Sequence, residues 1–297
     1  MRLHDDQVDV DEALAHRLLA RRLPHLAGLG LRRVPSAGTD NIIFRLGDDL
    51  ALRLPMHPGA VDGLRKELRW LPVLSPYLSL EVPAVVATGE PGDGYPFPWA
   101  VVRWLEGIDA LSGRPDDLGE LARTLGGFVR ELQGVDGAPV AGGEPGFARG
   151  LPVAGRDESV RQSLGQCAGD VDVVAVRAIW DDALTAAPWR GPPVWLHADL
   201  LPGNLLLRDG RLAGVLDFGA MASGDPAYDV TPAWHVLDAP SRRVFREVVG
   251  VDDATWCRAR GLVVAFGVGA LAYYRDTNPG MVRTAMRGLT EAVGDSR

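Results

Sequence analysis

The sequence predicts an α+β protein in two parts: a small N-terminal part with an antiparallel five-stranded sheet and one helix, and a larger part that is mostly helical. Short apolar runs separated by turn residues fill the first hundred positions, whereas apolar residues at helical spacing dominate after them. With 297 residues, 46% of them hydrophobic, the chain is long enough to bury the core that two such parts need. We therefore expect a small N-terminal lobe over 1–104 and a larger helical lobe over 105–297.

The first part is predicted from leucine spacing and turn residues. Leucines between Asp11 and Leu29 recur at helical intervals and predict an opening helix, and the same spacing predicts a second helix over 63–74. Glycine and aspartate separate the first apolar runs, so two hairpins are expected. The five predicted strands cover residues 31–34, 41–46, 50–54, 84–88 and 97–104.

The second part combines helical periodicity with one hairpin. A loop rich in glycine and proline is expected over 134–155. Two short strands, 204–207 and 212–216, flank the turn Arg208-Asp209-Gly210-Arg211. Helices are expected over 116–132, 157–164, 171–184 and from Pro240 onward.

Composition excludes several classes of partner. A formal charge of -8, from 39 acidic and 31 basic residues, gives no reason to expect nucleic acid, and a cationic small molecule fits this charge better. Cys167 and Cys257 are the two cysteines, so a disulfide framework is not implied and a reducing cytoplasm is expected. No apolar leader follows Met1, and the run 261–274 is too short to cross a bilayer comfortably. We expect no export, no membrane and no obligatory protein partner.

Two polar clusters follow apolar, strand-like runs in the second part. The segment 194–204 contains Asp199 and ends with Asn204, and the hairpin after it leads into Asp217-Phe218-Gly219. Transfer of a phosphoryl group needs a carboxylate beside the attacking hydroxyl and oxygen ligands for the Mg²⁺ that neutralises the phosphates. Asp199 suits the first task, and Asn204 and Asp217 suit the second as metal ligands.

Taken together, His-x-Asp-x-x-x-x-Asn followed by Asp-Phe-Gly resembles the protein-kinase-like superfamily, specifically the aminoglycoside and related antibiotic phosphotransferases. The resemblance covers nearly the full length and implies a two-lobed protein-kinase-like fold. It implies that Asp199 is the catalytic base or the residue that orients the hydroxyl, that Asn204 and Asp217 bind the metal, and that His197 supports the loop structurally. The implied donor is ATP or GTP with Mg²⁺, and the implied acceptor is a hydroxyl of an aminoglycoside or related antibiotic.

The N-terminal part, which the resemblance implies binds the nucleotide, departs from the family pattern. Arg53 stands in the strand where this superfamily places a lysine. The single lysine, Lys66, lies instead on a predicted helix beside Glu67, so it is poorly placed to take that role. We expect Arg53 to contact the phosphates and Glu67 to pair with it, although arginine and lysine hold oxygens differently. No glycine-rich loop precedes the first hairpin.

Four further residues are candidates for contacting the nucleotide. Ser36 and Thr39 lie in the turn that replaces the glycine-rich loop, where they either bind phosphate oxygens or form an ordinary polar turn. Val102 and Trp104 lie where the resemblance places the adenine, and Trp104 is equally well explained as a core residue.

Other readings stay open at this stage. A metabolic kinase for a sugar, choline-like or amino-alcohol substrate is the first alternative, and a catalytically silent nucleotide-binding protein is the second. Asp276 and Glu291 are candidates for binding ammonium groups of an acceptor, but acids on exposed helix faces are commoner. Asp225 and Asp229 are expected to cap or anchor the following helix.

Overall fold

The computed structural model describes residues 7–34, 38, 40–139 and 149–295. The chain divides into two compact units. Unit 1 comprises Met1–Pro76, Glu81–Glu106 and Leu216–Gly219, and unit 2 comprises Tyr77–Leu80, Gly107–Val215 and Ala220–Arg297. The sequence predicted a single boundary between residues 104 and 105. The boundary between the two units lies two residues later, and unit 1 also includes the Asp-Phe-Gly segment.

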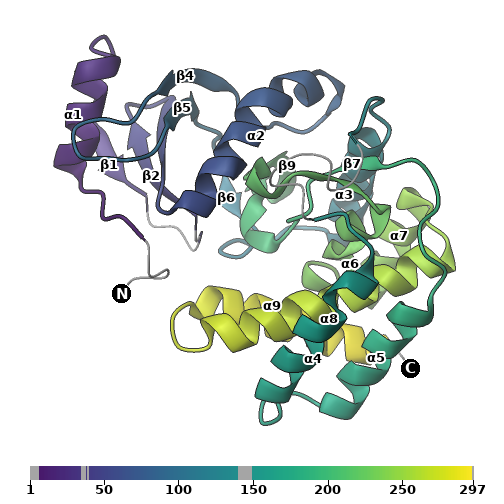
Figure 1. Cartoon of the computed structure of the whole chain (residues 1–297). Coiled ribbons are helices and arrows are strands. Elements are labelled where there is room, and N and C mark those ends of the chain that lie inside the picture. The colour runs from purple at the N-terminus through teal and green to yellow at the C-terminus, as the bar shows by residue number, and fades with distance from the viewer. Residues whose placement is uncertain (1–6, 35–37, 39, 140–148, 296–297) are drawn as a thin grey trace. The chain divides into compact units, whose positions relative to one another are not determined.

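Unit 1 contains the five-stranded antiparallel sheet that the sequence predicted (Figure 1). The strands are adjacent in the order β1-β2-β3-β5-β4. All six residues of β3 are buried, which fits its place in the middle of the sheet. The bounds are β1 Leu31–Arg33, β2 Asn41–Leu46, β3 Leu50–Pro55, β4 Val85–Gly89 and β5 Trp99–Arg103.

Two helices cover the two faces of this sheet. Leu18 and Leu19 of α1 (Glu12–Arg22) pack with Phe44 and Leu52 on one face. Leu64 of α2 (Pro58–Leu74) packs with Ala51, Ala100 and Val102, whose side chains point to the other face because side chains alternate along a strand. The face covered by α2 therefore also receives the side chain of Arg53, two residues after Ala51.

Both helices differ from their predicted bounds for reasons of proline chemistry. Helix α1 ends at Arg22 and not near 29, because Pro24 lacks the N–H that would continue it and disfavours helical geometry at Leu23. Helix α2 begins at Pro58 and not at 63, since proline is well suited to the first turn of a helix.

Unit 2 is mostly helical. Helix α8 (Asp253–Tyr274) packs against α4, α5 and α9, and α3 packs against α7 (Figure 1). A Cβ at Gly261 would lie 2.2 Å from the Cβ of Ala183, so this glycine allows the close approach of α8 and α5. The other bounds are α3 Leu118–Gln133, α4 Asp157–Gln166, α5 Val173–Thr185, α6 Pro232–His235, α7 Ala239–Val249 and α9 Pro279–Gly294.

Short strands in unit 2 carry the polar clusters. The predicted hairpin forms β8 (Leu205–Arg208) and β9 (Arg211–Val215), to which β6 (Ile108–Asp109) adds an edge. Strand β7 (Val194–Leu196) pairs with β10 (Ala222–Gly224). The sequence did not predict β6, β10 or α6, because elements of two to four residues give no periodic signal.

The described helices contain no segment both long and apolar enough to span a bilayer. The apolar run 261–274 belongs to α8, and Leu262, Val263, Val268 and Leu271 are buried there. Cys167 and Cys257 are free thiols.

Candidate active site

In unit 2, a loop follows the buried strand β7 and begins with His197, Ala198 and Asp199. Ala198 has a φ of 62°, a left-handed conformation that side-chain-bearing residues adopt at a cost. The carboxylate of Asp229 holds this conformation, because its two oxygens accept the backbone N–H groups of His197 and Ala198, each at 2.7 Å. His197 is fully buried, and its Nδ1 accepts the backbone N–H of Asp199 at 3.2 Å, the supporting contact that was expected.

Asp199 is held from two sides. Asn204, at the end of the 3-10 turn Pro202–Asn204, donates from Nδ2 to the backbone oxygen of Asp199 at 2.8 Å and to its Oδ2 at 3.1 Å. Arg149 Nη1 donates to Asp199 Oδ1 at 2.7 Å. Two residues predicted from the sequence, Asp199 and Asn204, therefore meet on one loop, and the cation Arg149 adds a partner that was not predicted.

Burial of Asp229 raises the pKa of its carboxyl group to about 7. The two backbone N–H groups oppose this rise, and the negative charge of Asp199 adds to it. Near neutral pH this carboxyl group therefore titrates directly beneath the loop that carries Asp199.

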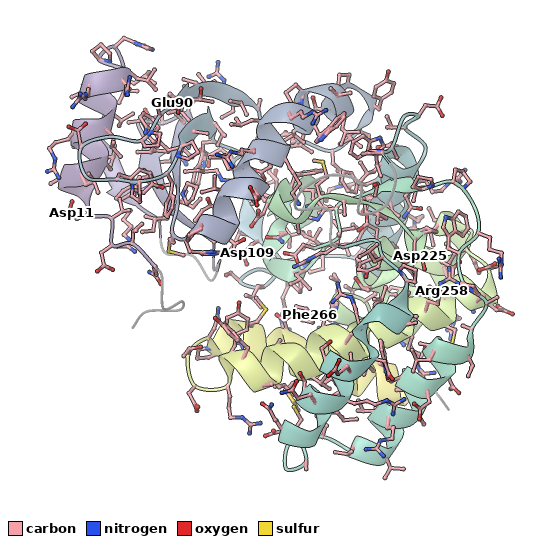
Figure 2. The ribbon with its side chains drawn as sticks, in the orientation of Figure 1. Asp11, Glu90, Asp109, Asp225, Arg258 and Phe266 are labelled. Carbon is pink, nitrogen blue, oxygen red and sulfur yellow. The ribbon has the colours of Figure 1, made fainter. Side chains whose placement is uncertain are left out.

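The 3-10 segment η5 (Pro226–Val230) that carries Asp229 is itself anchored by Asp225. Asp225 accepts the backbone N–H of Ala227 at 3.0 Å and caps η5. Its carboxylate oxygens also accept Arg258 Nε at 2.6 Å and Nη2 at 3.0 Å, a buried two-point ion pair with α8 (Figure 2). Asp225 thus caps the following element as expected, whereas Asp229 reaches back to the Asp199 loop.

Unit 1 contains a second charged cluster, centred on Arg53. Arg53 Nη1 donates to Glu67 Oε2 at 2.6 Å, and Nη2 lies 3.6 Å from Asp217 Oδ1. Burial would lower the pKa of Arg53, but the charges of Glu67 and Asp217 outweigh it and raise this pKa. Burial raises the pKa of Glu67 to about 6, against the lowering effect of Arg53. The ion pair forms as expected, and its role toward a nucleotide stays a prediction.

The residues proposed to hold magnesium suit that ion. Asp217 has a φ of 59° and a half-exposed side chain, and its Oδ1 accepts the N–H of Gly219 at 3.3 Å. With Arg53 and Glu67 it makes a cluster of one cation and two carboxylates, whose remaining negative charge favours a cation. No described residue donates to the amide oxygen of Asn204 in unit 2. Mg²⁺ keeps several water and phosphate ligands, so one carboxylate such as that of Asp217 can be enough for its attachment to the protein.

Larger metal-binding groups are absent from the part of the chain that the structure describes, where no three His, Cys, Asp or Glu residues gather to hold a metal. In unit 1, however, Arg53 Nε and Glu67 Oε1 are buried without a hydrogen-bond partner among the described residues. Buried polar atoms are usually paired, so these two atoms are suited to form hydrogen bonds with a bound polar group.

The other predicted nucleotide residues lie in unit 1. Val102 is buried in β5, and Trp104 follows β5 with the guanidinium carbon of Arg45 4.3 Å from its ring centroid. Both residues belong to the cluster beneath α2. Ser36 and Thr39 lie outside the described residues. Lys66 is in α2, and the cation that pairs with Glu67 is Arg53.

A pocket of about 120 Å³ opens beside Asp199 in unit 2. Apolar side chains from the loop and from α8 form much of its wall, and two arginines and Asp199 supply its charge. Asp276 and Glu291 do not line it. Glu291 is an ion-pair partner of the buried Arg242. The lining residues are Arg149, Arg156, Ala198, Asp199, Leu200, Leu201, Tyr228, Thr231, His235, Leu262, Ala265 and Phe266.

The two-part α+β fold and the loop that holds Asp199 beside Asn204 are those expected of a small-molecule phosphotransferase. A family model, the phosphotransferase enzyme family, matches residues 31–262. The chain therefore belongs to the phosphotransferase enzyme family.

Solved structures share the fold at low sequence identity. The GDP complex of wild-type aminoglycoside 2'-phosphotransferase-IIIa superposes with a TM-score of 0.68 at 21% identity, over 97% of this chain and 100% of that one. The macrolide 2'-phosphotransferase of Brachybacterium faecium gives 0.62 at 24% identity, over 94% and 98% of the two chains. These likenesses confirm the predicted kinase-like fold.

A curated relative matches over a short stretch. Homoserine kinase of Granulibacter bethesdensis is 45% identical to this chain over 53 residues, which are 18% of this chain and 17% of that protein. The match spans less than a fifth of either sequence.

Proposed function

We propose that this chain transfers the γ-phosphoryl group of ATP or GTP, with Mg²⁺, onto a hydroxyl of a small molecule. The observation that carries the proposal is the Asp199 loop of unit 2. Its carboxylate is fixed by Asn204 at 3.1 Å, and the loop itself is fixed by Asp229 at 2.7 Å. A carboxylate held this firmly next to a pocket is suited to receive the proton of a bound hydroxyl.

In this proposal each unit supplies one half of the chemistry. Asp199 orients the acceptor hydroxyl and takes its proton. Asn204 would offer its amide oxygen, and Asp217 its carboxylate, to Mg²⁺, which would supply positive charge to neutralise the phosphates. Arg53, held by Glu67, would contact phosphate oxygens, because a guanidinium stays charged when buried.

The solved neighbours support a nucleotide donor. Related chains were solved with GDP and with ADP. For this chain, the buried Arg53 Nε without a described partner supports the same kind of ligand. The presence of Asp199, Asn204 and Asp217 together favours an active enzyme over a silent binding protein. The two free cysteines suit a reducing cytoplasm, where ATP and GTP are plentiful.

Two acceptor classes have specific support. The neighbours include aminoglycoside and macrolide phosphotransferases, one of them solved with kanamycin, which favours an antibiotic hydroxyl. The short match to homoserine kinase favours a metabolite hydroxyl. Both classes require the same Asp199 chemistry.

The experiment is a screen for nucleoside diphosphate release with ATP and GTP, with and without Mg²⁺, over antibiotics and small alcohols. Asp199→Asn is the matched control, because it keeps the size of the side chain and removes the proton acceptor. Acceptor-dependent release that needs Mg²⁺ and falls by about 10² or more in Asp199→Asn is expected. Equal release by this variant would refute the assignment of Asp199, and calorimetry should show that it still binds Mg²⁺ and nucleotide.

A further inference from the structure

The pocket beside Asp199 in unit 2 has an apolar wall and a charged rim. Leu200, Leu201, Leu262 and Phe266 offer carbon surface to the skeleton of a bound molecule. Its volume of about 120 Å³ is close to that of cavities that hold one small ring. The described residues of unit 2 therefore enclose room for a small acceptor, or for one small group of a larger one.

Arg156 is a cation of this pocket that has no acidic partner among the described residues. Its Nε donates to the hydroxyl of the buried Tyr228 at 3.1 Å, and its guanidinium carbon lies 5.6 Å from the centre of that ring. The hydroxyl of Tyr228 in turn donates to the backbone oxygen of Leu151 at 3.1 Å. Among the described residues, no carboxylate lies within ion-pair distance of Arg156 and no acceptor engages its terminal nitrogens. The guanidinium is thus held in place by Tyr228 while its terminal N–H groups are available to an anion.

Arg149 is a second cation that lines the pocket, beside Asp199. It donates to Asp199 Oδ1 at 2.7 Å. An anionic group bound near Arg149 would draw the guanidinium toward itself and weaken its hold on Asp199. That exchange would leave the carboxylate better able to accept a hydrogen bond from a hydroxyl.

The charges of the pocket oppose a polycation. Among its described lining residues, Arg149 and Arg156 are cations and Asp199 is the single acid, and burial lowers the pKa of His235 to about 4, so His235 is neutral at pH 7. Even a fully ionised Asp229 beneath the loop would only cancel the remaining positive charge. The local charge at the pocket, and not the net charge of the chain, decides which acceptor is attracted.

We propose that the acceptor is a small hydroxy acid whose carboxylate is bound by Arg156 and whose hydroxyl faces Asp199. Arginine suits this task because its planar fork matches the two oxygens of a carboxylate. The inference rests on the proposed function. In the reaction, the hydroxyl oxygen of the acid bonds to the γ-phosphorus, the bond from this phosphorus to the bridging oxygen breaks, and the nucleoside diphosphate leaves. The hydroxyl proton passes to the carboxylate of Asp199.

The test uses matched acceptors. L-homoserine, L-threonine and D-glycerate are each assayed beside the matching carboxamide, in which a neutral group replaces the carboxylate, with kanamycin as the polycation, and nucleoside diphosphate release is measured. At least one acid should be phosphorylated with a kcat/KM about 10-fold or more above that of its amide, because the amide forfeits the charge-assisted pair. Turnover of none of the three acids, or better turnover of an amide or of kanamycin, overturns the inference.

Variants at Arg156 complete the test. Arg156→Gln should raise the KM for the preferred acid about 10-fold to 100-fold with little change in kcat, and should leave the KM for its amide unchanged. Arg156→Lys should recover part of the loss, which a purely structural role would not predict. Arg177→Gln, at an exposed arginine of α5, is the control and should match the wild type. An unchanged KM for the acid in Arg156→Gln also overturns the inference.

A separate calorimetric titration with Mg²⁺ and nucleotide distinguishes failure of the acceptor class from failure of the proposed function. Binding of nucleotide together with failure of the acids would overturn the acceptor class alone. Absence of nucleotide binding would overturn the proposed function itself.

Discussion

Asp229 fixes Ala198 in a left-handed conformation, through a hydrogen bond of 2.7 Å from the backbone N–H of Ala198 to Asp229 Oδ1. This contact sets the direction in which the next residue, Asp199, leaves the strand. The position of the candidate base is therefore determined by a carboxylate thirty residues further along the chain.

Replacing Asp229 by asparagine should impair both catalysis and folding. One oxygen remains to accept an N–H, but the amide NH₂ group faces the other N–H and repels it. We expect kcat to fall by about 10²-fold, as small misplacements of catalytic groups do, and the free energy of unfolding to fall by about 1–3 kcal/mol. Steady-state kinetics and urea unfolding measure the two effects. Asp172→Asn, at the exposed cap of α5, is the control, since asparagine caps helices as well as aspartate does. Equal kcat in both variants would show that Asp229 does not position the loop.

Asp217→Ala should weaken the binding of magnesium nucleotide. A half-exposed carboxylate beside Arg53 is the main anionic ligand that unit 1 offers to the ion. Losing even an outer hydrogen-bonding partner costs metal sites about 10-fold to 100-fold in affinity, so we expect a loss at least that large. Isothermal titration with Mg²⁺ and ATP or GTP measures it, with Glu12→Ala at the exposed start of α1 as the control. Unchanged affinity in Asp217→Ala would remove Asp217 from the metal site.

The buried pair of Arg53 and Glu67 should be strongly coupled. Removing Arg53 alone, as Arg53→Met, leaves a buried carboxylate without its cation and should cost about 3–5 kcal/mol of unfolding free energy. The double variant with Glu67→Gln should cost much less than the sum of the two single variants. A double-mutant cycle measures this coupling. The exposed pair Asp62 and Arg65, 3.4 Å apart on the same helix, is the comparison and should give about 0.2–1 kcal/mol. Equal coupling in the two pairs would contradict the prediction.

The sequence predicted what depends on local pattern. Strand alternation and turn residues were enough for the five-stranded sheet, and the pairing of Arg53 with Glu67 followed from the resemblance. The spacing of Asp199 and Asn204 within one loop likewise brought them together in space.

The missing parts depend on distant contacts. Arg149 stands in a segment rich in glycine and proline, where no periodicity distinguishes a site residue from a loop residue. Asp229 was predicted to anchor the following element. Its contacts with His197 and Ala198 could not be predicted, because they require that η5 pack beneath the loop. Arg156 gave no signal either, since its meaning comes from Tyr228, which lies 72 positions away. Charge placement in a pocket follows tertiary packing, so it could not be read from sequence spacing.

His235 should make the protein sensitive to acid. Burial lowers its pKa from 6.5 to about 4, and its ring packs edge-on against Phe266 at a centroid distance of 4.9 Å. Between these two pH values the unfolded chain binds the proton and the folded chain does not, so stability falls as the pH drops from about 6.5 to 4. The full effect is about 3 kcal/mol.

Asp229 and Glu67 act in the opposite direction, because their raised pKa values give stability that is lost as the pH rises through about 7 and about 6. Comparing His235→Asn with the wild type cancels these two contributions. Urea unfolding at pH 4, 5, 6 and 7 should show a shallower acid loss in His235→Asn, whereas His16→Asn, at an exposed histidine of α1, should follow the wild type. Parallel stability curves for His235→Asn and the wild type would mean that the folded protein accommodates a charged His235.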